Sequence, residues 1–164
     1  MRVRSFVSFV VGGLLGVAGG FAVGIFLYPY IFLADVVAAD QVGDAAARQV
    51  VARGTFIHAN PSDPIHYGRG DATVYADLVH LEANFEVGPG PKYHVYLVPE
   101  QDVTLDTDVA KTMFVDLGRL RAFKGSQNYE VPAGLQLENY SHLVIWCEQF
   151  GVLISPARLR PELK

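Results

Sequence analysis

The longest uninterrupted apolar stretch runs from Ser5 to Ala34 and holds 30 residues without one charged side chain. A helix needs roughly 20 apolar residues to cross a bilayer, so this stretch is long enough to do so. The alternative is a cleaved signal peptide, whose apolar core is usually about 7–15 residues long. The length therefore predicts a retained transmembrane anchor within residues 1–34, and cleavage near residues 18–22 stays the open alternative.

The charges on either side of this stretch predict its orientation. Arg2 and Arg4 precede it, and the first charged residue after it is Asp35. Positively charged flanks remain on the cytoplasmic side of a membrane. We therefore expect a single-pass membrane protein with a cytoplasmic N-terminus and an extracytoplasmic C-terminal domain.

Four glycines of the apolar stretch recur at every fourth position: Gly12, Gly16, Gly20 and Gly24. They would form one stripe along a helix, and such a stripe lets two helices approach closely in lipid. Glycine is also common in membrane spans. A homo-oligomer through this stripe is one hypothesis, and packing against a different membrane protein is another.

Residues 35–53 form the connection to the rest of the chain. The part from Val36 to Arg53 is rich in alanine and valine and carries spaced charges. This composition predicts a short juxtamembrane helix that acts as a stalk.

The pattern of residues 54–164 is mostly that of β-strands, because apolar and polar side chains alternate. In the first such run, the apolar positions are Val79, Leu81, Ala83, Phe85 and Val87. A second run spans residues 93–98, and Gly88-Pro89-Gly90-Pro91 between them marks a tight connection. Turn signals leave only short segments elsewhere, apart from one expected helical turn at Thr107–Lys111 before a strand at Thr112–Leu117. We predict an all-β domain, an antiparallel sandwich or barrel, with about 105 residues around one core.

Charge and motifs exclude several functions. All 17 acidic residues but only 11 of the 13 Lys and Arg lie beyond the apolar stretch. A nucleic-acid partner is not expected, since phosphate binding needs a basic surface. The chain has no GxSxG, GxGxxG or Walker motif, so no conventional catalytic constellation is visible and enzymatic activity is left undecided.

Cys147 is the only cysteine of the chain, and Trp146, the only tryptophan, precedes it in a predicted strand at residues 142–150. The alternation places Cys147 on one face with Leu143 and Ile145, so the strand can be buried on both sides. The polar residues 148 and 149 indicate that burial fades here, which makes an exposed rim position possible for the thiol. A structural core thiol, a redox or ligand group, and an intermolecular disulfide all remain open.

The five histidines show no spacing typical of a zinc site. His58 and His66 bracket a loop with Asp63 that could close around a metal, although a solvated loop is the commoner structure, and no metal site is predicted. We expect the other three to occupy solvent-facing or rim positions of strands: His80, His94 and His142.

Several motifs nevertheless resemble one known family. They are Asp116–Leu120, Lys124–Pro132 with its G-x-Q-x-Y, the I-W-C of residues 145–147, Tyr140, Phe150 and Ala157–Leu159, with Gly54–Phe56, His58, Gly70–Ala72, Phe85, Gly90–Pro91 and Val95–Leu97 upstream. Together they resemble the DM-thirteen domain of Skeletor-type proteins over residues 53–159. Lys92-Tyr93 departs from this pattern, because the family usually has an acidic and then an aliphatic residue there.

The resemblance implies a β-sandwich related to the haem- and sugar-binding DOMON group, and a role in electron transfer with Cys147 as a free thiol or as a ligand. The cofactor is unknown, and haem or a metal is possible. The residues expected around it are Cys147, Trp146, Gln127, Tyr129, Tyr96 and His58, and in a haem site His58 or His94 would share ligation. Covalent c-type haem is excluded, since there is no C-x-x-C-H motif.

Two functions from different classes therefore remain. The first is a membrane-anchored extracytoplasmic electron-transfer domain centred on Cys147, with an unknown redox partner. The second is a non-enzymatic binding or scaffold module of the cell envelope, in which Cys147 only packs and Gln127, Tyr129 and Tyr96 line an exposed groove. Gln127 and Tyr129 also have a simpler explanation, because their polar groups can satisfy loop backbone.

Overall fold

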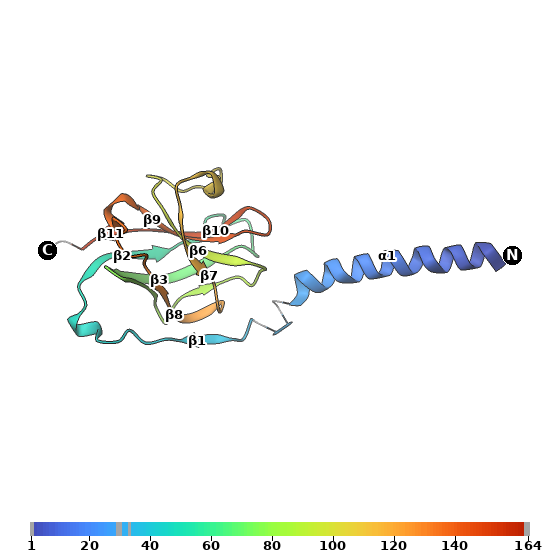
Figure 1. Cartoon of the computed structure of the whole chain (residues 1–164), viewed down its shortest axis with the longest axis horizontal. Coiled ribbons are helices and arrows are strands. Elements are labelled where there is room, and N and C mark those ends of the chain that lie inside the picture. Colours follow the sequence, from blue (N-terminus) through green and yellow to red (C-terminus); the bar gives the residue numbers. More distant parts are fainter. Residues whose placement is uncertain (1, 29–30, 33, 163–164) are drawn as a thin grey trace.

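The computed structural model describes residues 2–28, 31–32 and 34–162, and it shows one long helix that projects from a β domain (Figure 1). Helix α1 (Arg2–Tyr28) contains a segment, Val3–Ile25, that is long and apolar enough to cross a membrane. None of that segment is buried against the rest of the protein. The predicted apolar helix is confirmed as far as Tyr28; residues 29, 30 and 33 of the predicted anchor lie outside the described residues.

Eleven strands are present in the described residues, joined in one sheet of the order β1-β8-β4-β3-β2-β10-β9-β6-β7, with β11 beside β2 and β5 beside β3 and β8. Their bounds are β1 (Val37–Ala39), β2 (Val50–Phe56), β3 (Gly68–Tyr75), β4 (Leu78–Leu81), β5 (Glu86–Val87), β6 (Tyr93–Val98), β7 (Val115–Arg119), β8 (Lys124–Glu130), β9 (His142–Cys147), β10 (Val152–Arg158) and β11 (Arg160–Pro161). Short 3₁₀ turns lie at η2 (Ala45–Ala47), η3 (Val109–Lys111) and η4 (Leu137–Asn139). The predicted mostly β domain is confirmed.

The main core lies between two parts of this sheet that are not neighbours within it. It takes Val79 and Leu81 from β4, and Leu143 and Ile145 from β9. The sheet thus folds over on itself, a packing compatible with the expected sandwich.

Strand β9 is buried on both faces, as the sequence pattern predicts. Leu143, Ile145 and Cys147 face the main core, whereas Val144 and Trp146 face a second, smaller apolar cluster. The loop before β7 covers that second face with Val109 and Phe114 among others. The helical turn expected at residues 107–111 is present as η3.

The predicted juxtamembrane helix is wrong. Residues 37–39 form β1, which pairs in parallel with residues 124–126 of β8. Asp40 continues this contact: its carboxylate accepts hydrogen bonds from the Arg121 guanidinium and from the backbone N–H of Asn128. Long-range partners and β-branched valines thus outweigh the helix propensity of the alanines. Most of the segment lies along the edge of the β domain (Figure 1).

The alternating run at residues 79–87 is also interrupted. Strand β4 ends at Leu81, a turn closed by Phe85 N–H to Glu82 C=O follows, and β5 takes up only residues 86–87. The sequence pattern correctly gives Val79, Leu81, Phe85 and Val87 as buried, but it overlooks the turn, in which Ala83 is exposed.

Candidate functional site

Cys147 is the last residue of β9, a strand that has partners on both sides. It lies opposite Tyr93 of β6 and Val152 of β10. The residue is 1% exposed, and its Sγ is 3.3 Å from the Pro91 carbonyl oxygen, to which the thiol donates. The rim exposure considered from Glu148 and Gln149 is wrong for Cys147, since burial fades only from residue 148 onward.

The surroundings of Cys147 favour the neutral thiol. Burial raises the pKa of Cys147 above its ordinary value, and the nearby Glu148 carboxylate raises it further. The backbone amides of Phe150 and Gln149 oppose this by stabilising the thiolate, but the net direction is upward. A thiolate is the form that attacks disulfides and binds metals, so Cys147 is held in its unreactive form.

Cys147 does not fit the axial ligand of a haem. Its side chain is packed inside the main core, and it does not line either of two hollows found on the described surface. An axial thiolate needs an open slot beside the sulfur. A haem at this position would require β9 to be displaced from its neighbours.

Gln127 and Tyr129 on β8 form a buried hydrogen-bond cluster. The Gln127 Oε1 accepts from the N–H groups of Arg121 (3.0 Å) and Ala122 (3.2 Å) and from the Tyr129 hydroxyl (2.9 Å), while Nε2 donates to the Ala122 carbonyl at 2.8 Å. Gln127 is fully buried and Tyr129 nearly so. The prediction that they line an exposed groove is wrong; they satisfy the loop before β8, which was the simpler explanation.

Tyr96 and Trp146 lie on the opposite side of the sheet from Cys147, in the smaller apolar cluster. The Tyr96 ring is stacked on Phe114 with centroids 4.2 Å apart, and its hydroxyl donates to Glu148 Oε1 at 2.7 Å. Burial and the Glu148 carboxylate raise the pKa of Tyr96 well above its usual range. Tyr96 does not line a groove, but it fixes the position of one carboxylate.

His58 is not brought to Cys147. Its Nε2 lies 2.8 Å from the Asp63 carbonyl oxygen, and its ring meets Tyr67 edge to face. The Asp63 carboxylate accepts from the N–H groups of Ile65 and His66 and contacts His66 Nδ1 at 2.7 Å. These bonds hold the pKa of Asp63 near 2, and they link the two ends of the loop between His58 and His66.

Two of the three histidines predicted to occupy solvent-facing or rim positions of strands are buried. His80 is paired with Asn128 through Nδ1 at 2.6 Å, and His142 lies with Nδ1 3.0 Å from the Glu100 carbonyl oxygen. Burial lowers the pKa of His142. The prediction from strand alternation is wrong for His80 and His142, because neighbouring side chains or loops cover the second face of their strands.

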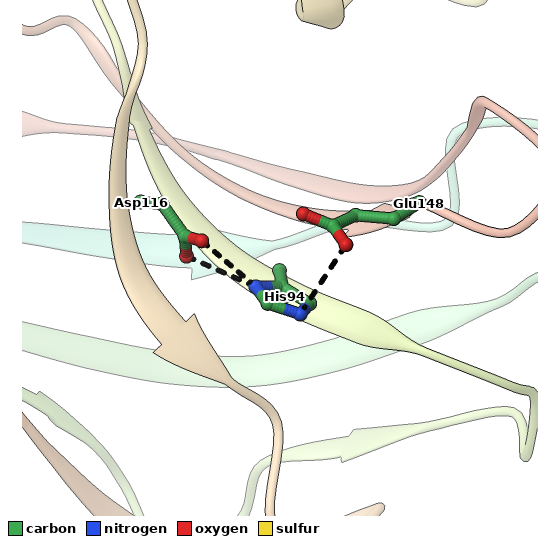
Figure 2. A group of neighbouring side chains, drawn as sticks. All are labelled: His94, Asp116 and Glu148. Atoms are coloured by element: carbon green, nitrogen blue, oxygen red, sulfur yellow. Dashed lines mark hydrogen bonds and ion pairs between the residues drawn. The ribbon is translucent and has the colours of Figure 1, made fainter.

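His94 is partly exposed, as expected of a rim position, and it meets two carboxylates that the sequence does not connect with it (Figure 2). His94 Nδ1 lies 3.0 and 3.1 Å from the two Asp116 oxygens, and Nε2 lies 3.5 Å from Glu148 Oε2. Each of the three residues offers one atom that could bind a metal ion, and these three atoms all lie within 4.8 Å of one another. The three residues come from β6, β7 and the turn after β9, so their convergence depends on strand pairing.

A family model described as "Electron transfer DM13" matches residues 62–159. The match covers more than half of the chain and includes Cys147 and the His94 cluster (His94, Asp116 and Glu148). No curated protein and no solved structure matches the chain.

Proposed function

The chain belongs to the electron transfer DM13 family, and from this membership we propose that its β domain carries electrons at the extracytoplasmic face of a membrane. The family match is the observation that carries the proposal, because it covers β3 to β10.

The tether in this proposal is α1, retained as a signal-anchor. Its Val3–Ile25 segment leaves large apolar side chains such as Phe9 and Leu15 exposed, and lipid is the environment in which such exposure costs nothing. Arg2 and Arg4 stand at the N-terminal end of the segment and Asp35 follows it, which supports a cytoplasmic N-terminus. The domain would then work close to the bilayer, where a membrane-bound redox partner can reach it.

The part that Cys147 plays in electron transfer has two versions. In one, the Cys147 sulfur is the redox centre, and this needs a thiolate that solvent or a ligand can reach. In the other, Cys147 packs the core and the electron-carrying group lies elsewhere. Its burial, its raised pKa and its hydrogen bond to Pro91 favour the second version.

The proposal is tested on the full chain purified from membranes in detergent. We would record absorption spectra after addition of dithionite and of ferricyanide, together with metal analysis, for the wild type and Cys147→Ser. We expect a reversible spectral change that survives in Cys147→Ser. Loss of the change in a folded Cys147→Ser protein would make the thiol the redox centre, and a folded wild type that neither holds a cofactor nor changes would contradict electron transfer.

A binding module is the second candidate, and one feature of the surface favours it. A charged hollow opens over β2, β3, β10 and β11, with Arg53, Asp71 and Arg158 in its lining. Under this alternative the partner is an envelope component of mixed charge. Arg53→Ala and Arg158→Ala would then release the partner without changing any redox spectrum.

A further inference from the structure

The backbone directs His94, Asp116 and Glu148 toward one point. Strands β6 and β7 change register between Val95 and Tyr96, so that His94 faces Arg119 whereas Tyr96 faces Asp116. Gly118, in the left-handed region at a φ of 124°, donates its N–H to Asp116 Oδ1 at 2.8 Å. A β-bulge of this kind re-aims a side chain, and here it turns Asp116 toward His94.

The imidazole of His94 is held in a defined orientation. Its Nδ1 is within hydrogen-bond distance of both Asp116 oxygens, which favours the tautomer with the proton on Nδ1. The lone pair of Nε2 then points toward Glu148, as Figure 2 shows by the direction of the ring. A carboxylate that accepts the other ring proton is the usual support of a metal-bound histidine.

Glu148 is held from its far side. Tyr96 donates to Glu148 Oε1, and the Glu148 N–H donates to the Lys92 carbonyl at 3.1 Å, which leaves Oε2 facing His94 Nε2 at 3.5 Å. An ion bonded tetrahedrally at about 2.0–2.2 Å holds its ligand atoms about 3.4 Å apart. The two atoms therefore already have the separation that such an ion needs.

The charge around this point suits a cation. Two carboxylates flank the ring, and the Lys92 ammonium lies 2.9 Å from Glu148 Oε2. The Lys92 side chain is 54% exposed, so its ammonium can leave for solvent when another cation arrives. His94, Glu148 and Asp116 are all partly open to water, which gives an ion access.

We propose that His94 Nε2 and Glu148 bind a divalent first-row transition-metal ion, with Asp116 orienting the imidazole and Lys92 as the cation that the metal displaces. Imidazole and carboxylate together suit ions such as Zn²⁺ and Cu²⁺, and water would complete the coordination. A redox-active ion here would supply the electron-carrying group that the burial of Cys147 leaves unassigned, and this last step rests on the proposed function. The proposal that a metal ion binds here does not depend on the proposed function.

The test is calorimetric titration of Zn²⁺ into the chelator-treated full chain in detergent. Zn²⁺ is redox-silent, so this result is independent of electron transfer. We expect one ion per chain, binding at least about tenfold weaker in Glu148→Gln, and binding at least about tenfold tighter in Lys92→Ala. Asp116→Asn should lose less affinity than Asp116→Ala, because an amide oxygen still accepts the Nδ1 proton.

The matched control is Glu82→Gln. Glu82 Oε2 lies 3.6 Å from His80 Nε2, a similar pair, but His80 has no second carboxylate on its Nδ1. The Glu82→Gln substitution should leave Zn²⁺ binding unchanged. In a separate measurement on the wild type, Cu²⁺ spectra should show that one imidazole nitrogen coordinates the ion. Absence of stoichiometric Zn²⁺ binding, or equal affinity in the wild type, Glu148→Gln and Lys92→Ala, would overturn the proposal; near-ultraviolet circular dichroism confirms that each variant is folded.

Discussion

The burial of Cys147 predicts that its thiol is protected from reagents in the native protein. Strand β9 pairs with β6 and with β10 along its whole length, so Sγ becomes accessible only when that pairing opens. Central strands of this kind usually open with a free energy close to that of global unfolding, which is about 5 kcal/mol or more for a domain. Each 1.4 kcal/mol corresponds to about a factor of ten, so labelling should be slower than in the unfolded chain by about 10³-fold or more.

The assay compares the rate at which a maleimide labels Cys147 in detergent, with and without urea, at one pH. The raised pKa of Cys147 acts in the same direction, because it lowers the thiolate fraction of the folded protein. A matched control is Gln149→Cys in a Cys147→Ala background, since residue 149 is exposed two positions further on. The control thiol should react nearly as fast in the native as in the unfolded protein.

A native Cys147 that is labelled within about tenfold of the unfolded rate would refute this reasoning, because it would mean an opening free energy of only about 1.4 kcal/mol. The thiol would then be available to a ligand. The first version of its role, as the redox centre, would be favoured.

Three further outcomes are expected. Gln127→Leu removes the partner of the Ala122 backbone groups and of the Tyr129 hydroxyl, so urea unfolding followed by Trp146 fluorescence should show a loss of about 3 kcal/mol or more, against about 1 kcal/mol for Tyr129→Phe; equal losses would contradict the cluster. Burial and Arg158 lower the pKa of His142, against the opposing effects of the Glu100 carbonyl and of Asp102. The unfolded state therefore takes up the proton at a higher pH than the folded state, so the stability present above pH 6.5 should fall as the pH falls below that value, and His142→Gln should flatten this dependence in urea melts at pH 7 and pH 5. If the glycine stripe pairs two copies, Gly16→Ile should reduce cross-linked dimers in membranes and Ala18→Ile, on the other side of α1, should not; equal dimer yields would exclude the stripe as the contact.

The strand pattern could be predicted from the sequence where the signal is local. Alternation in residues 142–147 correctly separates Leu143, Ile145 and Cys147 from Val144 and Trp146, because the side-chain period of a strand is fixed at two residues. The apolar helix is equally local, since length and composition alone define it.

Features set by long-range pairing could not be predicted in this way. Residues 37–39 look helical by composition, but their partners in β8 lie about 87 positions further along the chain. His94 and Asp116 meet through a bulge that no local pattern reveals. The contact of His94 with Glu148 could have been anticipated only from the pairing of β6 with β9, for which the sequence carries no separate signal.

The central claim, electron transfer by this domain, is tested most directly by voltammetry of the full chain reconstituted in a supported bilayer on an electrode. We expect a reversible one-electron couple that persists in Cys147→Ser. Folded protein that yields no faradaic current above that of the lipid alone, after loading with Cu²⁺ as well as before it, would contradict the claim and leave the binding module as the function.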